Sequence, residues 1–135
     1  MKDGNIIVIT HGHFGEEMIK SAEMIIGEID NIKALSLTPD LSLEDLINKT
    51  KTEVAGIEDD VILLTDLFGG TPNNVASYFK QAMNIPVVTG LNLAMLISVI
   101  MNRDNHLADG ISQVDFEVNV LSDVVTEAQN AIRIV

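Results

Sequence analysis

The chain has 135 residues and a mass of 14.7 kDa, which is the usual size of a single domain. It is 47% hydrophobic and 21% charged, a balance that excludes an unfolded chain. Twenty Asp and Glu against eight Lys and Arg give a net charge of −12. This charge argues against nucleic acid and anionic membrane surfaces as partners, because Lys and Arg are the residues that bind phosphate groups.

Short β-branched runs alternate with longer helical patterns in the first half of the chain. Apolar residues recur every three or four positions from Phe14 to Ile26 and stop at Gly27, which predicts a helix. Ser42 precedes Asp45 by three residues, the spacing of a capping box at the start of another helix. Residues 6–9 form a compact apolar run, typical of a strand that is buried on both faces, and further strands are predicted over 32–37 and 61–64.

The second half continues the alternation of strands and helices. Pro72 is favoured in the first turn of a helix, and residues 86–88 form a short strand pattern. Apolar spacing predicts helices over 93–101 and 116–131, and residues 132–135 predict a last short strand. The longest apolar stretch ends at Met101 and is too short to cross a membrane, which takes about twenty residues.

This alternation predicts an α/β fold, with one open, mostly parallel sheet and helices on both faces. We expect residues 1–135 to form one domain, because no linker or repeat divides them. In such sheets, ligands bind beyond the carboxyl ends of the strands, where the strand order reverses. That rule selects the two loops that follow the first and third predicted strands, residues 10–15 and 65–74.

The two loops carry residues suited to phosphoryl chemistry. If the first and third strands are neighbours, His11 and Asp66 leave equivalent strand ends and meet. A carboxylate that accepts a hydrogen bond from one imidazole nitrogen leaves the other nitrogen free as a nucleophile. Gly69, Gly70 and Thr71 precede a helix and supply backbone N–H groups and a hydroxyl, which suits an anion such as phosphate.

Two other interpretations of these loops remain open. A lone histidine after a strand is commonly structural, and it is the joint placement of His11 and Asp66 that favours a functional site. His13 could join them in a metal-dependent hydrolase, but the ligands are few, and we expect His13 at the surface and no metal. The absence of cysteine excludes disulfides and agrees with a cytoplasmic location.

Four segments of the chain match a known family in order: residues 7–12, 22–27, 66–73 and 89–96. Through them the chain resembles the IIA component of the mannose class of the bacterial phosphoenolpyruvate-dependent sugar phosphotransferase system. The resemblance implies that His11 is phosphorylated on Nε2, that Asp66 holds Nδ1, and that Thr71 lies near the phosphate.

The resemblance also implies partners. The carrier protein HPr would donate the phosphoryl group, a histidine on a IIB protein in another chain would accept it, and no cofactor is involved. The family forms homodimers in which a C-terminal strand crosses to the partner, and residues 132–135 are the segment expected to do so here as an antiparallel strand. A regulatory module that signals sugar supply through its phosphorylation state is the alternative.

Overall fold

The computed structural model describes residues 4–57, 60–109 and 116–135, and it has the expected α/β architecture. All strand pairs are parallel, and the strand order is β2-β1-β3-β4. The strands are β1 (Asn5–His11), β2 (Ile32–Leu37), β3 (Val61–Thr65) and β4 (Val87–Thr89). The helices are α1 (Phe14–Ile26), α2 (Leu43–Ala55), α3 (Gly70–Met83), α4 (Leu93–Asp109), the π-helical segment η1 (Phe116–Leu121) and α6 (Ser122–Asn130).

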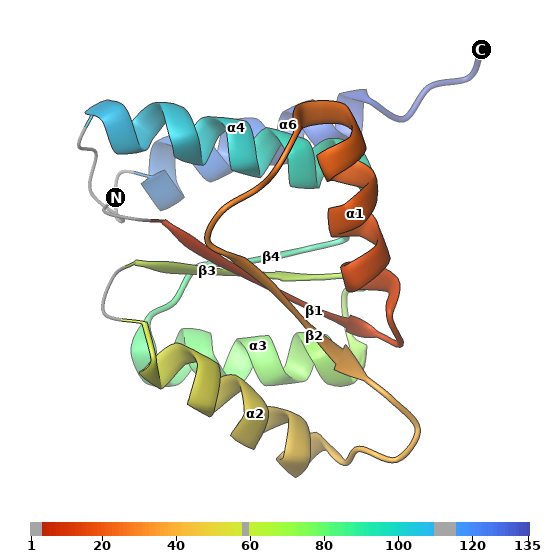
Figure 1. Ribbon diagram of the computed structural model, residues 1–135, viewed down its shortest axis with the longest axis vertical. Coiled ribbons are helices and arrows are strands. Elements are labelled where there is room, and N and C mark those ends of the chain that lie inside the picture. The colour runs from red at the N-terminus through yellow and green to blue at the C-terminus, as the bar shows by residue number, and fades with distance from the viewer. Residues whose placement is uncertain (1–3, 58–59, 110–115) are drawn as a thin grey trace.

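The sheet lies between two helical layers. Helices α1, α4 and α6 cover one face, and α2 and α3 cover the other (Figure 1). Side chains alternate between the two faces along each strand, so Ile6 and Val8 pack with the first layer and Ile7 and Ile9 with the second. Because the central strands are apolar on both faces, they are buried, as the runs of β-branched residues predict.

Several local predictions are confirmed by the structure. Helix α2 begins after Ser42, whose hydroxyl accepts a hydrogen bond from the Asp45 N–H, while the Asp45 carboxylate accepts one from the Ser42 N–H. Pro72 lies in the first turn of α3. Within the described residues, no helix has both the length and the apolar character needed to cross a membrane.

Three boundaries differ from the sequence prediction. Helix α4 continues past Met101 to Asp109. Arg103, in this added part of the helix, is buried and donates hydrogen bonds to the carbonyls of Gly4 and Asp30. The helix predicted over 116–131 consists of η1 followed by α6. Residues 132–135 belong to none of the four strands and lie exposed beyond α6, since no strand among the described residues pairs with them.

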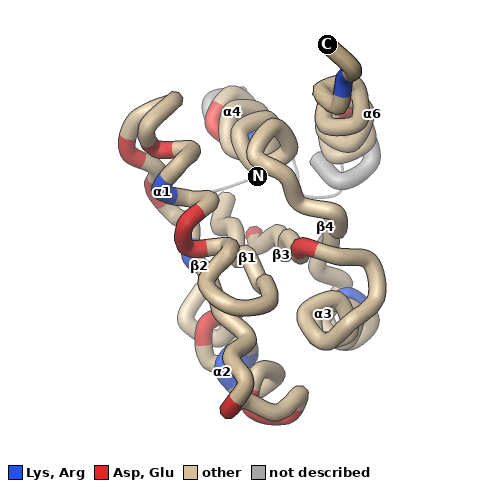
Figure 2. Tube along the Cα trace, turned by 90° about the vertical axis from the view of Figure 1, so that its right-hand side faces the viewer, with Lys and Arg blue, Asp and Glu red and all other residues tan. Residues whose placement is uncertain are grey.

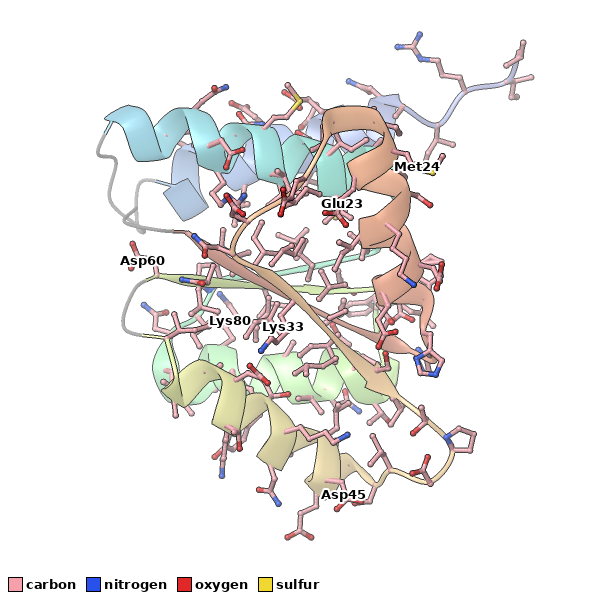
Figure 3. All side chains as sticks on the ribbon, viewed as in Figure 1. Glu23, Met24, Lys33, Asp45, Asp60 and Lys80 are labelled. Carbon is pink, nitrogen blue, oxygen red and sulfur yellow. The ribbon has the colours of Figure 1, made fainter. Side chains whose placement is uncertain are left out.

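The strand order places the predicted loops next to each other. The chain moves from β1 outward to β2, returns across β1 to β3, and continues to β4, so the direction of winding reverses between β1 and β3. The carboxyl ends of both strands lie at the right-hand edge in Figure 1, while the N-terminal ends, with Asp60 labelled before β3, lie at the opposite edge (Figure 3). The crevice at a reversal point is the usual ligand position in an open parallel sheet.

Candidate functional site

Strand register brings His11 and Asp66 together at the carboxyl edge of the sheet. Ile9 on β1 is opposite Thr65 on β3, so His11 ends β1 just where Asp66 follows β3. The side chain of His11 shares a sheet face with Ile7 and Ile9, the face that α3 covers. The sequence prediction that these two loops meet is therefore confirmed.

One carboxylate oxygen of Asp66 binds His11 twice. Asp66 Oδ2 accepts a hydrogen bond from the His11 backbone N–H at 2.9 Å and lies 3.0 Å from His11 Nδ1. Its other oxygen, Oδ1, is buried and has no hydrogen-bond partner among the residues that the structure describes. An ionised Asp66 favours the tautomer with hydrogen on Nδ1, because a carboxylate only accepts hydrogen bonds. The Nε2 lone pair is then available for chemistry.

The beginning of α3 lies against the other side of the imidazole ring. Gly69 is the residue before α3, and Gly70 begins it with a φ of +81°. A Cβ atom on Gly70 would lie 3.3 Å from His11 Cε1 and 3.6 Å from His11 Nε2. Any other residue would therefore be strained and would crowd the ring. The close approach places Cε1 and Nε2 of His11 beside the helix N-terminus, where backbone N–H groups lack acceptors within the helix.

A hollow of about 440 Å³ opens beside the ring. Thr71 lines it together with His11, and the remaining wall is mostly apolar and comes from the segment between β2 and α2. Half of the His11 side-chain surface is exposed, whereas only 15% of the Asp66 side chain is. The His11 ring can therefore be reached from solvent, while the Asp66 carboxylate that binds it is shielded.

Charge is unevenly distributed around this edge. Figure 2 looks onto it and shows acidic residues on α1 and α2, whereas the chain from β3 through α3 to β4 carries few charges. The first turn of α3 contains no acidic residue. An anion held at the start of α3 would therefore meet the positive end of the helix dipole without a nearby carboxylate from the same helix turn.

His13 does not join His11 in a metal-binding group. It is the residue before α1, its side chain is largely exposed, and its Nδ1 lies 3.5 Å from Glu16 Oε2. Among the residues that the structure describes, no three His, Asp or Glu side chains gather closely enough to hold a metal ion. No observation thus favours the hydrolase interpretation.

The structure places three of the predicted residues around the His11 ring: Asp66 beside Nδ1, Gly70 against Cε1 and Nε2, and Thr71 in the wall of the same hollow. Gly69 precedes Gly70 in the chain, and His13 lies apart, beside Glu16. Sequence reasoning overlooked the wall between β2 and α2, although this loop also follows a strand at the same edge. It also overlooked the exposed Phe68 and the buried Thr10, whose hydroxyl binds the loop after His11.

Fold and site together define an open parallel α/β domain with an oriented, accessible histidine beside a helix N-terminus. The family model described as "PTS system fructose IIA component" matches residues 5–114, and the chain belongs to this family, EIIA-man. Four-fifths of the chain lies within that match, including every residue of the site.

Individual relatives agree with this membership. The chain is 34% identical over 103 residues to the "PTS system mannose-specific EIIAB component" of Escherichia coli (strain K12), covering 74% of this chain and 32% of that protein. It thus spans about a third of that relative's length. It is also 34% identical over 104 residues to the "PTS system sorbose-specific EIIA component" of Lacticaseibacillus casei, with 74% of each chain covered. The crystal structure of EIIA from Streptococcus agalactiae superposes with a TM-score of 0.81 at 29% identity, covering 97% of this chain and 96% of that one.

Proposed function

We propose that this protein is a phosphoryl carrier that accepts a phosphoryl group from HPr on His11 and passes it to a IIB protein during sugar uptake. The observation that carries the proposal is the position of the ring. Nδ1 lies 3.0 Å from Asp66, and the Nε2 side faces Gly70 at the start of α3. Membership in a family of phosphotransferase system IIA components supports the same activity.

The proposed transfer needs no metal, cofactor or net proton movement. The Nε2 lone pair of His11 attacks phosphorus on the phosphohistidine of the donor. A new N–P bond forms while the donor's N–P bond breaks and its electron pair returns to the donor ring. Asp66 keeps the hydrogen on Nδ1 and stabilises the positive charge that develops on the ring. The same steps in reverse transfer the group to a histidine of IIB.

The start of α3 is the proposed binding site for the phosphoryl oxygens. The N–H groups of Gly70 and Thr71 lie in the first turn, where they have no acceptors within the helix. The Thr71 hydroxyl lines the hollow beside His11 and can donate a hydrogen bond to a phosphoryl oxygen. Gly69 and Gly70 allow the backbone to approach the ring without a side chain in between.

Incubation with phosphoenolpyruvate, enzyme I and HPr tests the proposal. Intact-protein mass spectrometry should show the gain of one phosphoryl group that is lost on mild acid treatment, as expected for a phosphohistidine. His11→Ala should show no gain. His13→Ala is the matched control, because His13 lies two residues away and has no role in the proposed transfer, and it should be phosphorylated normally. Failure of the wild type to gain mass with active upstream proteins would refute the function.

The second part of the proposal concerns the assembly. We infer a homodimer in which residues 132–135 of one copy add an antiparallel strand to the partner's sheet. β4 is an edge strand, and a groove of about 600 Å³ runs along it between β4 and α6. The tail exposes most of Ile132 and all of Ile134 and Val135 to solvent, which is unfavourable unless a partner covers them. Deletion of residues 132–135 should convert a dimer to a monomer in light scattering.

The regulatory alternative has no observation in its favour. The relatives reported above are components of sugar-specific systems by name, and we infer that this protein acts with HPr and IIB in the cytoplasm. Rapid phosphoryl transfer from the carrier to a IIB protein would support transport. Transfer to a transcription regulator in place of IIB would support the alternative.

A further inference from the structure

A buried hydroxyl lies directly behind the candidate nucleophile. Thr10 precedes His11 in β1 and is fully buried. Because side chains alternate along a strand, Thr10 points toward α1, on the face of Val8, while His11 points toward α3. Thr10 therefore does not touch the hollow at His11, and any influence on the ring must pass through the backbone.

The Thr10 hydroxyl closes the loop that carries His11. Its oxygen accepts a hydrogen bond from the Gly15 N–H at 2.9 Å and donates one to the Gly12 carbonyl at 3.3 Å. The first bond satisfies a donor in the first turn of α1, where His13, the residue before the helix, provides no side-chain cap. The second joins the residues on either side of His11.

Packing around Gly15 leaves this arrangement little freedom. A Cβ atom on Gly15 would lie 3.0 Å from Val8 Cγ1 and 3.2 Å from both Cγ2 and Oγ1 of Thr10. The beginning of α1 thus packs directly on the Thr10 side chain. The loop is fixed on its other side by the Gly12 N–H, which donates to the Leu37 carbonyl at the end of β2 at 2.7 Å.

We propose that Thr10 is a positioning residue for His11, and that its hydroxyl fixes the backbone on both sides of His11 so that Nδ1 stays on Asp66 and Nε2 stays turned toward Gly70. The proposal rests on the phosphoryl-carrier function for its kinetic consequence only. Fixing residues 10 and 12 restrains the backbone dihedrals of His11 and hence the direction of its Cα–Cβ bond, from which the ring reaches Asp66 and Gly70. A small displacement of a reacting atom is costly, since a misplacement of about 1 Å can slow a reaction about a hundredfold.

The test compares variants that separate the hydroxyl from the rest of the side chain. Thr10→Val removes the hydroxyl and keeps the shape, and Thr10→Ser keeps the hydroxyl and removes a methyl group. Thr50→Val is the matched control, because Thr50 is also fully buried and its hydroxyl donates to the Leu46 carbonyl at 2.8 Å within α2. Thr10→Ala is a second hydroxyl-free variant in case Thr10→Val does not fold.

Two readouts distinguish positioning from a contribution to stability. In ¹⁵N NMR of the unphosphorylated protein, the fraction of His11 rings with hydrogen on Nδ1 should fall in Thr10→Val, recover in Thr10→Ser and stay unchanged in Thr50→Val. In single-turnover transfer from phosphorylated HPr, the rate constant should fall roughly tenfold in Thr10→Val, with unchanged apparent affinity because Thr10 is buried away from any partner.

Each outcome has a definite meaning. The proposal would be overturned if Thr10→Val had the same fraction of His11 rings with hydrogen on Nδ1, and the same transfer rate, as Thr50→Val. Thr10 would then be a residue that only stabilises the fold. The proposal would also be overturned if Thr10→Ser lost as much of the transfer rate as Thr10→Val, because serine retains the hydroxyl. If the wild type accepts no phosphoryl group, the carrier function fails, while the ring signals still decide whether Thr10 positions His11.

Discussion

The two ends of the same sheet hold polar side chains in opposite ways. At the carboxyl end, His11 is half exposed and one oxygen of Asp66 is buried without a partner in the described structure. At the amino end, Arg103 of α4 is 3% exposed, and its Nη1 donates to the carbonyls of Gly4, Asp30 and Asn31 at 3.2, 2.8 and 3.3 Å. Its Nε binds Asp104 at 2.9 Å.

This difference suggests separate tasks for the two ends of the sheet: the amino end stabilises the fold, and the carboxyl end is the end proposed to carry the chemistry. A buried guanidinium, hydrogen-bonded through Nη1 and Nε, joins the residue before β1, the α1–β2 loop and α4 into one unit. The other end keeps an uncapped helix start and an under-satisfied carboxylate next to a ring that solvent can reach. Substitutions at the first end should therefore change stability alone, and substitutions at the second should change chemistry.

Asp66→Asn should have the largest effect and should act on chemistry. An amide group can donate to Nδ1, which favours hydrogen on Nε2 and removes the nucleophilic lone pair. Phosphoryl transfer should fall by roughly a thousandfold, as expected when a histidine is held in the wrong tautomer. Rapid-quench measurement of transfer from phosphorylated HPr gives the rate. A wild-type rate in this variant would remove Asp66 from the mechanism.

Arg103→Met should have the next largest effect and should act on stability. The carbonyls of Gly4 and Asp30 lose the Arg103 donor, and the Asn31 carbonyl keeps only its bond from the Ile6 N–H. We therefore expect the free energy of unfolding to fall by about 3 kcal/mol. Urea denaturation measures the change, and the transfer rate at 25 °C should stay unchanged. Asp104→Asn is the control, since Asp104 is largely exposed and its ion pair contributes little. A large loss of transfer in Arg103→Met would contradict the separation of the two ends.

Gly70→Ala should affect both stability and phosphoryl transfer, so it does not fit the separation between the two ends of the sheet. Its φ of +81° strains any side chain, which should lower stability by about 1 kcal/mol. The added methyl group would press on His11 Cε1 and slow transfer roughly tenfold through displacement of the ring. Thermal unfolding and transfer kinetics on the same sample separate the two effects. Full activity would show that the ring tolerates the contact.

Asp45→Asn should have the smallest effect, at the exposed start of α2 (Figure 3). Hydrogen bonds from the backbone and then the side chain of Ser42 lower the pKa of Asp45 below its usual value of 3.8. A carboxyl whose pKa is lowered by folding stabilises the protein above its unfolded pKa and loses that effect as pH falls through the folded value. Wild type should therefore exceed Asp45→Asn in stability at neutral pH, and the difference should vanish in strong acid. An equal difference in strong acid would contradict this assignment.

Much of the fold follows from local patterns in the sequence. The apolar runs of β1 and β3, the Ser42–Asp45 capping box and the position of Pro72 are each recognisable within a few residues. The errors arise where a distant contact outweighs the local pattern. Arg103 is charged and follows Met101, so the sequence suggests a helix end, but its carbonyl partners lie more than 70 residues away. The tail after Ala131 has a strand pattern, but none of the strands in the described part of the chain pairs with it.

By itself, the sequence determined that strands and helices alternate, and that His11 and Asp66 each follow a strand. Those features depend on periodicity and on the residue types at strand ends, which are local. Only the tertiary structure decided that one oxygen of Asp66 binds both the backbone and the ring of His11, that Gly70 lies against the ring, and that Thr10 holds the loop from behind. The contacts of Asp66 and Gly70 with His11 join segments more than fifty residues apart. They depend on strand order and register, which are fixed by packing on both faces of the sheet. The Thr10 contact depends instead on how α1 packs on β1.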